Sequence, residues 1–394
     1  MTAPALLTPL QIGPLTARNR LWLPPMCMYS VEARDGVATD WHVLHYGTRA
    51  VGGFGTVIVE ATAVSPEGRL SEFDLGLWDD AQVEGHRRIV KAIHDGGALA
   101  GVQLGHGGRK AGTLPWRPDV KGARAGTLEG WDLVAPSAIP YPSEGHAVPR
   151  ELDEAGIARL VEAFGQAARR AIHAGYDLIE IHGAHGYLIH QFLSPLSNTR
   201  ADAFGGDEEG RRRFPLQVVA AVRRAIDDAE RGSAGRGSAG RDGAGSAPRA
   251  LGIRLSATDW ADGGLTGEET AAFALELAAA GVDAIHVSTG GNVPAKVPVG
   301  PGYQVPCAAQ ARAALAASAA DGGPGAGVVV ATVGVIESAE QAEAILTAGD
   351  ADAIAVGRPA LRDPYLPVRW AHELGVNGWR EAGLPIQYWR GAWR

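Results

Sequence analysis

Three side chains that can donate protons or bind a ligand follow one short apolar run: His182, His185 and Tyr187 come directly after Ile179-Glu180-Ile181. On its own, a His-x-x-His pair can be two buried structural histidines or two ligands of a metal ion. A metal site would need a third ligand and supporting carboxylates, which the sequence does not place in any obvious position. A single tyrosine would by default be a packing residue. Taken together, we interpret the three as the catalytic end of a β-strand.

The run that carries them, residues 177–181, is short, apolar and β-branched, and helical patterns flank it at 153–174 and 211–228. Strands that alternate with helices form parallel βαβ units, in which ligands bind beyond the carboxyl ends of the strands. Further strands are predicted at 21–24, 56–60, 99–104, 251–255, 284–287, 327–331 and 353–356, and further helices at 80–95, 267–280, 306–319 and 338–348. Eight βα units within 394 residues predict an α/β fold, the (β/α)8 TIM barrel.

Three segments depart from this repeat. Residues 5–20 alternate apolar and polar residues around Gly13-Pro14, which predicts a hairpin that plugs one end of the barrel. Residues 111–150 are rich in Trp, Pro and Gly and too long for an ordinary connection, so we expect a loop or lid over the site. Residues 231–248 contain a tandem Arg-Gly-Ser-Ala-Gly repeat and predict a flexible, disordered insert. As a domain linker it would leave half a barrel with exposed sheet edges on each side, so we expect residues 1–394 to form one domain.

The composition limits the partners. A net charge of -8 argues against nucleic acid or an anionic membrane surface as the main partner. The two cysteines cannot form a disulfide framework, and no charged-then-apolar leader precedes the fold. No apolar run approaches the ~20 residues that a membrane span requires. We therefore expect a soluble, cytoplasmic protein that acts on small molecules.

Seven motifs, each at a predicted strand end or in the segment that follows one, carry a family resemblance. They are Pro24-Pro25-Met26-Cys27-Met28-Tyr29, Val59-Glu60-Ala61, Gln103-Leu104-Gly105-His106-Gly107-Gly108-Arg109-Lys110, Ala135-Pro136-Ser137, the His-His-Tyr stretch continued through Phe192-Leu193-Ser194-Pro195, Gly205-Gly206 and Val356-Gly357-Arg358-Pro359. With this set the chain resembles the Old Yellow Enzyme family of flavin-dependent ene-reductases, in particular its bacterial YqjM-like and xenobiotic-reductase-like (thermophilic-like) subgroup. The resemblance implies noncovalently bound FMN, with NADPH or NADH as hydride donor. Its substrates would be activated alkenes, that is, α,β-unsaturated carbonyl or nitro compounds, which receive hydride at the β-carbon.

The resemblance also implies residue roles. His182 and His185 would donate N–H groups to the oxygen on which negative charge develops, which stabilises the transition state more than the ground state. Tyr187 would protonate the α-carbon from the opposite face. Cys27 would lie near the flavin and tune its potential, and Tyr29 would line the substrate pocket.

The implied cofactor-binding residues come from several strand ends. Arg254 would stabilise the negatively charged reduced flavin. Glycines after the last two strands would let the backbone approach the FMN phosphate. The Arg358 guanidinium could donate two parallel hydrogen bonds to it. The full set is Pro24, Pro25, Met26, Cys27, Ala61, Gln103, Arg254, Gly334, Gly357 and Arg358.

The carboxyl-terminal tail, residues 364–394, resembles the tail that reaches a neighbouring active site in this subgroup. Arg390 would then be a substrate-binding residue of a homodimer or homotetramer; the alternative is a solvated tail arginine. Two features have no counterpart in the family pattern: the Arg-Gly-Ser-Ala-Gly insert and the length of residues 111–131.

Two rival functions remain open at this point, and a third is excluded. One is a metal-dependent TIM-barrel hydrolase or lyase that uses His182 and His185 as ligands. Another is a ligand-binding barrel without turnover. A dienoyl-CoA reductase type would need an iron-sulfur cluster, which two cysteines cannot supply. Neither the physiological alkene nor the choice between NADPH and NADH can be predicted, because such barrels carry no dinucleotide fingerprint.

Overall fold

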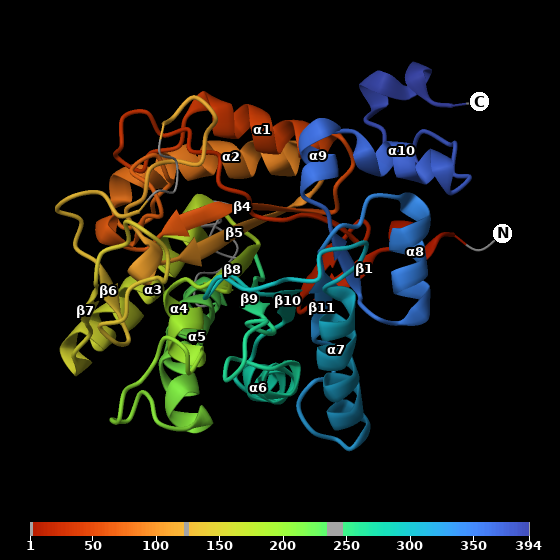
Figure 1. The fold of residues 1–394 in the computed structure, drawn as a ribbon. Coiled ribbons are helices and arrows are strands. Elements are labelled where there is room, and N and C mark those ends of the chain that lie inside the picture. Colours follow the sequence, from red (N-terminus) through yellow and green to blue (C-terminus); the bar gives the residue numbers. More distant parts are fainter. Residues whose placement is uncertain (1–2, 122–125, 235–246, 394) are drawn as a thin grey trace.

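Eight parallel strands close into one barrel in a computed structural model that describes residues 3–121, 126–234 and 247–393 (Figure 1). Each strand pairs with the next one along the chain, and β12 closes the ring on β3. The strands are β3 (Leu21–Leu23), β4 (Thr56–Ala63), β5 (Leu99–Gly105), β8 (Leu178–Gly183), β9 (Ala250–Ser256), β10 (Ala284–Ser288), β11 (Val329–Thr332) and β12 (Ala353–Ala355). The predicted (β/α)8 barrel is confirmed, and the strands before and after segment 231–248 belong to the same closed sheet.

Helices surround this barrel (Figure 1). They are α1 (Asp40–Val51), α2 (Val83–Asp95), α3 (Glu154–Ala174), α4 (Leu188–Leu193), α5 (Glu208–Ala234), α6 (Gly267–Ala279), α7 (Val305–Ala320), α8 (Ala339–Ala348), α9 (Arg358–Arg362) and α10 (Leu366–Glu373). The sequence did not predict α1, in which histidines and Gly47 interrupt the apolar pattern. It also placed the start of the insert too early, because α5 continues to Ala234. Residues 235–246 of that predicted insert lie outside the described residues.

The amino-terminal end of the barrel is closed by an antiparallel hairpin of β1 (Leu10–Ile12) and β2 (Leu15–Ala17). Side chains alternate between buried and exposed along both strands, as expected for a hairpin with one face on a core. The buried face packs into an apolar cluster with the first residues of the barrel strands, including Leu178 and Ala284. The predicted plug is confirmed.

An aspartate precedes three of the eight barrel strands, β8, β10 and β12, in the motifs Asp177-Leu178-Ile179, Asp283-Ala284-Ile285 and Asp352-Ala353-Ile354. Each carboxylate accepts the backbone N–H of the preceding strand, from Ala100 (2.7 Å), Leu251 (2.8 Å) and Val330 (3.0 Å) respectively. The backbone N–H of each aspartate donates to the carbonyl of that same residue, at 2.8 Å in all three cases. We call these two-way contacts the aspartate clamps; they fix the register of β5–β8, β9–β10 and β11–β12.

Two irregular segments flank the barrel. In residues 111–150 the described part contains only the two-residue strand β6 (Val134–Ala135), which pairs with β7 (Arg150–Glu151). The tail contains α10 and a final 3-10 turn, Ile386–Gly391. Among the described residues, no helix has the length and apolarity to cross a membrane.

Candidate active site

The three side chains predicted to be catalytic form one ring cluster at the carboxyl end of β8. The ring centroid of His182 lies 5.1 Å from that of His185 and 4.9 Å from that of Tyr187, and the His185 and Tyr187 centroids are 6.4 Å apart. All three pairs are edge-on. His185 has a φ of 59°, a left-handed conformation that few side chains adopt without support. That turn brings both imidazoles and the phenol into one place.

Burial keeps both imidazoles uncharged. It lowers the pKa of His182 and of His185 well below the ordinary histidine value, and the nearby Arg254 cation lowers both further. Nδ1 of His182 accepts the Ala184 backbone N–H at 3.3 Å, so its proton resides on Nε2. A neutral imidazole still has one N–H group that can donate a hydrogen bond. Unlike an imidazolium cation, it does not readily transfer that proton to the oxygen that it binds. The cluster can therefore stabilise negative charge on an oxygen by hydrogen bonding.

His185 is held from two sides. Its backbone N–H donates to Ser256 Oγ at 2.9 Å, and its Nε2 lies 2.9 Å from Ser288 Oγ. The Ser288 hydroxyl also lies 3.0 Å from Gln304 Oε1 and can turn its proton to either partner. When it donates to His185 Nε2, the neutral ring carries its own proton on Nδ1, where it can be donated to a ligand. Sequence reasoning missed both serines, which have no motif to mark them beyond their place at the ends of β9 and β10.

Lys110, which follows the neighbouring strand β5, supports the same turn. Its Nζ donates to the carbonyls of His185 (2.7 Å) and Gly291 (2.8 Å) and lies 5.0 Å from the ring centroid of Tyr187. Gly291 itself has a φ of 96°. The sequence placed Lys110 at a strand end without a role; the structure shows that it ties together the ends of β5, β8 and β10.

A buried polar chain crosses the barrel interior beneath the ring cluster. Gln103 Nε2 donates to Glu180 Oε1 at 2.7 Å, and Glu180 Oε2 lies 3.0 Å from His286 Nδ1. Burial lowers the pKa of Arg254, whose Nε finds no hydrogen-bond partner in the described part of the chain. Glu180 was missed as a functional residue, although a carboxylate between two isoleucines in an apolar strand is itself a signal.

A second buried carboxylate fixes the segment that carries Cys27 and Tyr29. Glu60 Oε2 accepts the backbone N–H of Met28 at 2.6 Å, and its Oε1 lies 3.2 Å from the Tyr46 hydroxyl. Tyr29 has a φ of 50° and so shares the left-handed conformation of His185. Both predicted residues, Cys27 and Tyr29, are half-buried and lie on the loop that follows β3.

Comparisons with known proteins decide what this arrangement is. The family model described as "NADH:flavin oxidoreductase / NADH oxidase family" matches residues 5–377. The chain belongs to this family. An NADPH dehydrogenase of Geobacillus thermodenitrificans is 41% identical over 389 residues, which cover 99% of this chain and 98% of that one.

Solved structures agree. Morphinone reductase is 30% identical with a TM-score of 0.74 and covers 95% of this chain and 90% of its own. An old yellow enzyme homologue from Zymomonas mobilis is 28% identical, with a TM-score of 0.71 and coverage of 94% and 93%. The resemblance to the Old Yellow Enzyme family is thus confirmed. The chain is an FMN-dependent, NAD(P)H-linked oxidoreductase, and nothing in the comparisons supports a metal-dependent hydrolase.

The residues present fit FMN. In a flavin oxidoreductase of this family, the buried Arg254 with its unpartnered Nε is suited to an electron-rich ring edge, and Gln103 keeps its carbonyl available because only its Nε2 is bonded to Glu180. Gly334 has a φ of 121°, and a Cβ there would lie 2.7 Å from Gln304 Nε2. Gly334 follows β11, and the exposed Arg358 follows β12. Donors and open backbone therefore lie on adjacent strand ends, as a phosphate requires.

Arg390 lies apart from these residues. It is exposed and stacks on its own neighbour, 5.5 Å from the Trp389 ring centroid. The tail lines a surface cavity with Arg18, Asp95 and Gly97, which precede barrel strands and so mark the amino-terminal end. The active site of the same chain is at the opposite end of the barrel.

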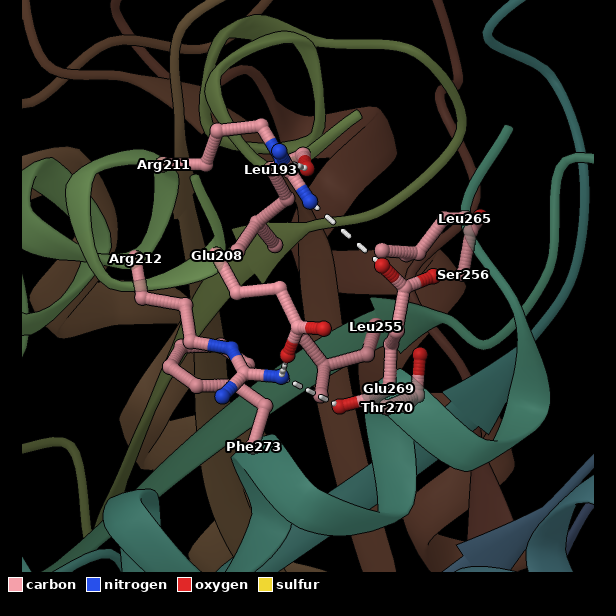
Figure 2. A pocket seen from close by; sticks show the side chains of 10 residues that line it. All are labelled: Leu193, Glu208, Arg211, Arg212, Leu255, Ser256, Leu265, Glu269, Thr270 and Phe273. Atoms are coloured by element: carbon pink, nitrogen blue, oxygen red, sulfur yellow. Dashed lines mark hydrogen bonds and ion pairs between the residues drawn. The ribbon is translucent and has the colours of Figure 1, made fainter. Parts of the chain in front are cut away.

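A narrow pocket between α4, α5 and α6 lies beside this site and shares Ser256 with it (Figure 2). Its arginines are paired: Arg211 with Glu269 at 3.4 Å and Arg212 with Glu276 at 2.8 Å. Because its charges are already matched within the fold, we assign this cavity no ligand. In the described part of the chain, no group of three or more His, Cys, Asp or Glu side chains could hold a metal ion.

Proposed function

We propose that the ring cluster binds the carbonyl or nitro oxygen of an activated alkene. The observation that carries the proposal is the convergence of two neutral imidazoles and a phenol at one strand end, beside a buried Arg254. When bound, FMN supplies hydride transfer from NAD(P)H to the β-carbon of the alkene. His182 and His185 stabilise the negative charge that then develops on the oxygen, and Tyr187 gives its hydroxyl proton to the α-carbon.

Other residues bind and orient the partners. FMN would be held by the backbone of Pro24, Pro25, Met26 and Cys27, by the strand end at Ala61 and by Gln103. Arg254 would stabilise its negative charge, and Gly334, Gly357 and Arg358 would bind its phosphate. Cys27 tunes its potential and Tyr29 contacts the substrate; the left-handed Tyr29 conformation, which the Glu60 contact to Met28 supports, favours a fixed position for both.

We also propose that the active chain is a homodimer or homotetramer in which Arg390 completes a neighbour's site. The position of the tail supports this, because Arg390 is exposed at the end of the barrel opposite its own ring cluster. Exposed apolar side chains at Ile386 and Trp389, on the same turn, would be covered by a second copy. A single-domain organisation over residues 1–394, residues 111–150 as a lid, and a cytoplasmic location stay predictions.

The test of the proposed function is an anaerobic visible spectrum of the purified protein, taken before and after NADPH and then after cyclohexenone. We expect a flavin band that NADPH bleaches and cyclohexenone restores. A band that bleaches but does not return with the enone would contradict the assignment of the ring cluster. A protein that stays colourless after incubation with FMN would contradict the whole proposal.

A further inference from the structure

A second cavity lies directly behind the ring cluster. It is partly open to solvent, and its lining includes His182, Tyr187, Asp74, His106 and Arg69; the ends of β4 and β5 and Gly68 complete its wall. The space is narrow, so water fits but an alkene does not. It therefore connects the catalytic tyrosine with titratable groups that the proposed reaction does not use.

Two buried side chains of this cavity have polar atoms without a hydrogen-bond partner among the described residues: Asp74 Oδ1 and His106 Nε2. Both side chains are fully or almost fully buried, with 1% of Asp74 and 3% of His106 exposed. Unsatisfied buried polar atoms are rare, and buried water is their usual partner. His106 Nδ1 accepts the Gly108 N–H at 3.0 Å, so its Nε2 carries a proton and can donate to such a water.

The other oxygen of Asp74 is fully used. Oδ2 accepts two backbone N–H groups, from Leu70 at 2.8 Å and Ser71 at 3.0 Å. This contact fixes the loop after β4 and leaves Oδ1 as the only oxygen that can carry a proton. The side chain thus presents one titratable atom at the wall of a cavity that Tyr187 also lines.

We propose that Asp74 and the water of this cavity form a relay that returns a proton to Tyr187 after each turnover. The proposal rests on the function proposed above. When Tyr187 gives its proton to the α-carbon, a phenolate remains. Water gives a proton to the phenolate oxygen, the Asp74 Oδ1–H gives its proton to that water, and the Asp74 carboxylate regains a proton from bulk solvent. His106 orients the water through its Nε2–H.

The charges around Asp74 agree with this role. Burial raises the pKa of Asp74 to about 8, so the acid holds its proton at neutral pH. Glu60 on β4 raises the pKa further, and Arg69 and the two backbone N–H donors on its own loop lower it. Burial lowers the pKa of His106 to about 4 and that of His182 well below its ordinary value, so neither adds a charge.

The experiment compares the first turnover with later ones in Asp74→Asn. Asparagine keeps an oxygen for the Leu70 and Ser71 N–H groups but cannot deliver a proton. Enzyme reduced beforehand and mixed once with cyclohexenone uses the proton already on Tyr187, so we expect the wild-type rate of flavin reoxidation. Steady-state turnover with NADPH needs that proton replaced. We expect it to fall at least ~10-fold, less than the ~10²- to 10⁴-fold that a direct general acid contributes.

A matched control is Asp283→Asn. Like Asp74, Asp283 has a raised pKa and accepts a backbone N–H. It is only partly buried, however, and it lies at the amino-terminal end of the barrel. It should leave the ratio of steady-state to single-turnover rates unchanged. In wild-type enzyme the steady-state rate should decline as pH rises through about 8, the Asp74 pKa, while the single-turnover rate does not.

Two results would overturn the relay. One is an Asp74→Asn enzyme with the wild-type ratio and pH profile. The other is an equal loss in the single-turnover and steady-state rates, which would make Asp74 a purely structural residue. Wild-type reduced enzyme that cyclohexenone fails to reoxidise would instead contradict the proposed function, and the relay with it.

Discussion

The two ends of the barrel use buried carboxylates in opposite ways. At the amino-terminal end, Asp177, Asp283 and Asp352 each accept a backbone N–H from a neighbouring strand, and two of them also bind an arginine. At the carboxyl end, Asp74 leaves one oxygen without a hydrogen-bond partner among the described residues, and Glu180 contacts the side chains of Gln103 and His286. Carboxylates at the first end hold the fold together. At the second end Glu60 and Asp74 also hold loops through backbone N–H groups, but Asp74 keeps one oxygen that can exchange a proton.

Backbone conformation shows the same division. Tyr29 and His185, both at the carboxyl end, adopt left-handed conformations, whereas the hairpin that closes the other end does so only at Gly13. Glycine adopts this conformation without strain, and larger residues need support from their surroundings. Stability and catalysis are therefore located at different ends, and substitutions can separate them.

The sharpest test of this division is Tyr187→Phe. We expect flavin reoxidation by cyclohexenone to slow by ~10²- to 10⁴-fold, because the α-carbon loses its proton donor. Stopped-flow absorbance measures this rate. Bleaching by NADPH and the unfolding temperature should stay as in the wild type; a large drop in the unfolding temperature would show that the two ends are not separable.

The complementary change at the other end is Ile12→Ala. Ile12 is fully buried in the hairpin cluster, so the free energy of unfolding should fall by ~2–5 kcal/mol. Urea unfolding followed by fluorescence measures it. Flavin reduction and reoxidation rates of the folded protein should be unchanged at a temperature well below its midpoint, and a parallel loss of activity would contradict the comparison.

A smaller effect is expected for Lys110→Met, which keeps the aliphatic stem but removes the contacts to the His185 and Gly291 carbonyls. With the turn less firmly held, the imidazole donors are less well placed, and reoxidation should slow roughly 10-fold. Single-turnover stopped flow measures the change. Lys91→Met, which removes an exposed lysine paired with Asp95 on α2, is the control and should have no effect.

The smallest effect concerns pH. A hydrogen bond to Asp177 raises the pKa of the half-exposed His94 at the amino-terminal end. The folded-state pKa then lies above the unfolded one, so the pair stabilises the fold below the unfolded pKa and the contribution is lost as pH rises through the folded pKa. Because the pair is solvated, we expect less than about 1 kcal/mol. Urea unfolding at pH 6 and pH 9 measures the change in the free energy of unfolding between the two pH values. We expect the loss of stability toward pH 9 to be smaller in His94→Gln than in the wild type. The same change in both proteins would refute a contribution from the His94–Asp177 pair.

Much of the fold could be predicted because each strand is an apolar run between helical patterns, and the hairpin alternates cleanly around Gly13. The ring cluster was predictable as well, since His182, His185 and Tyr187 lie within six residues of one strand end. Partners from distant strands were not. The closed barrel is what brings together the strands that carry Lys110, Ser288 and Glu180. No local sequence pattern shows that these side chains lie close to one another.

The aspartate clamps divide the barrel into strand pairs, and β3–β4 form a further pair through the Gly55 N–H and the Leu21 carbonyl. Segment 235–246 falls between β8 and β9, that is, between two clamped pairs rather than inside one. An insertion at this position therefore does not separate a clamp aspartate from the backbone N–H group that it accepts. The same logic favours circular permutation: a chain with new ends at this junction retains every clamp, whereas one opened between β9 and β10 loses the covalent link that brings Asp283 back to Leu251.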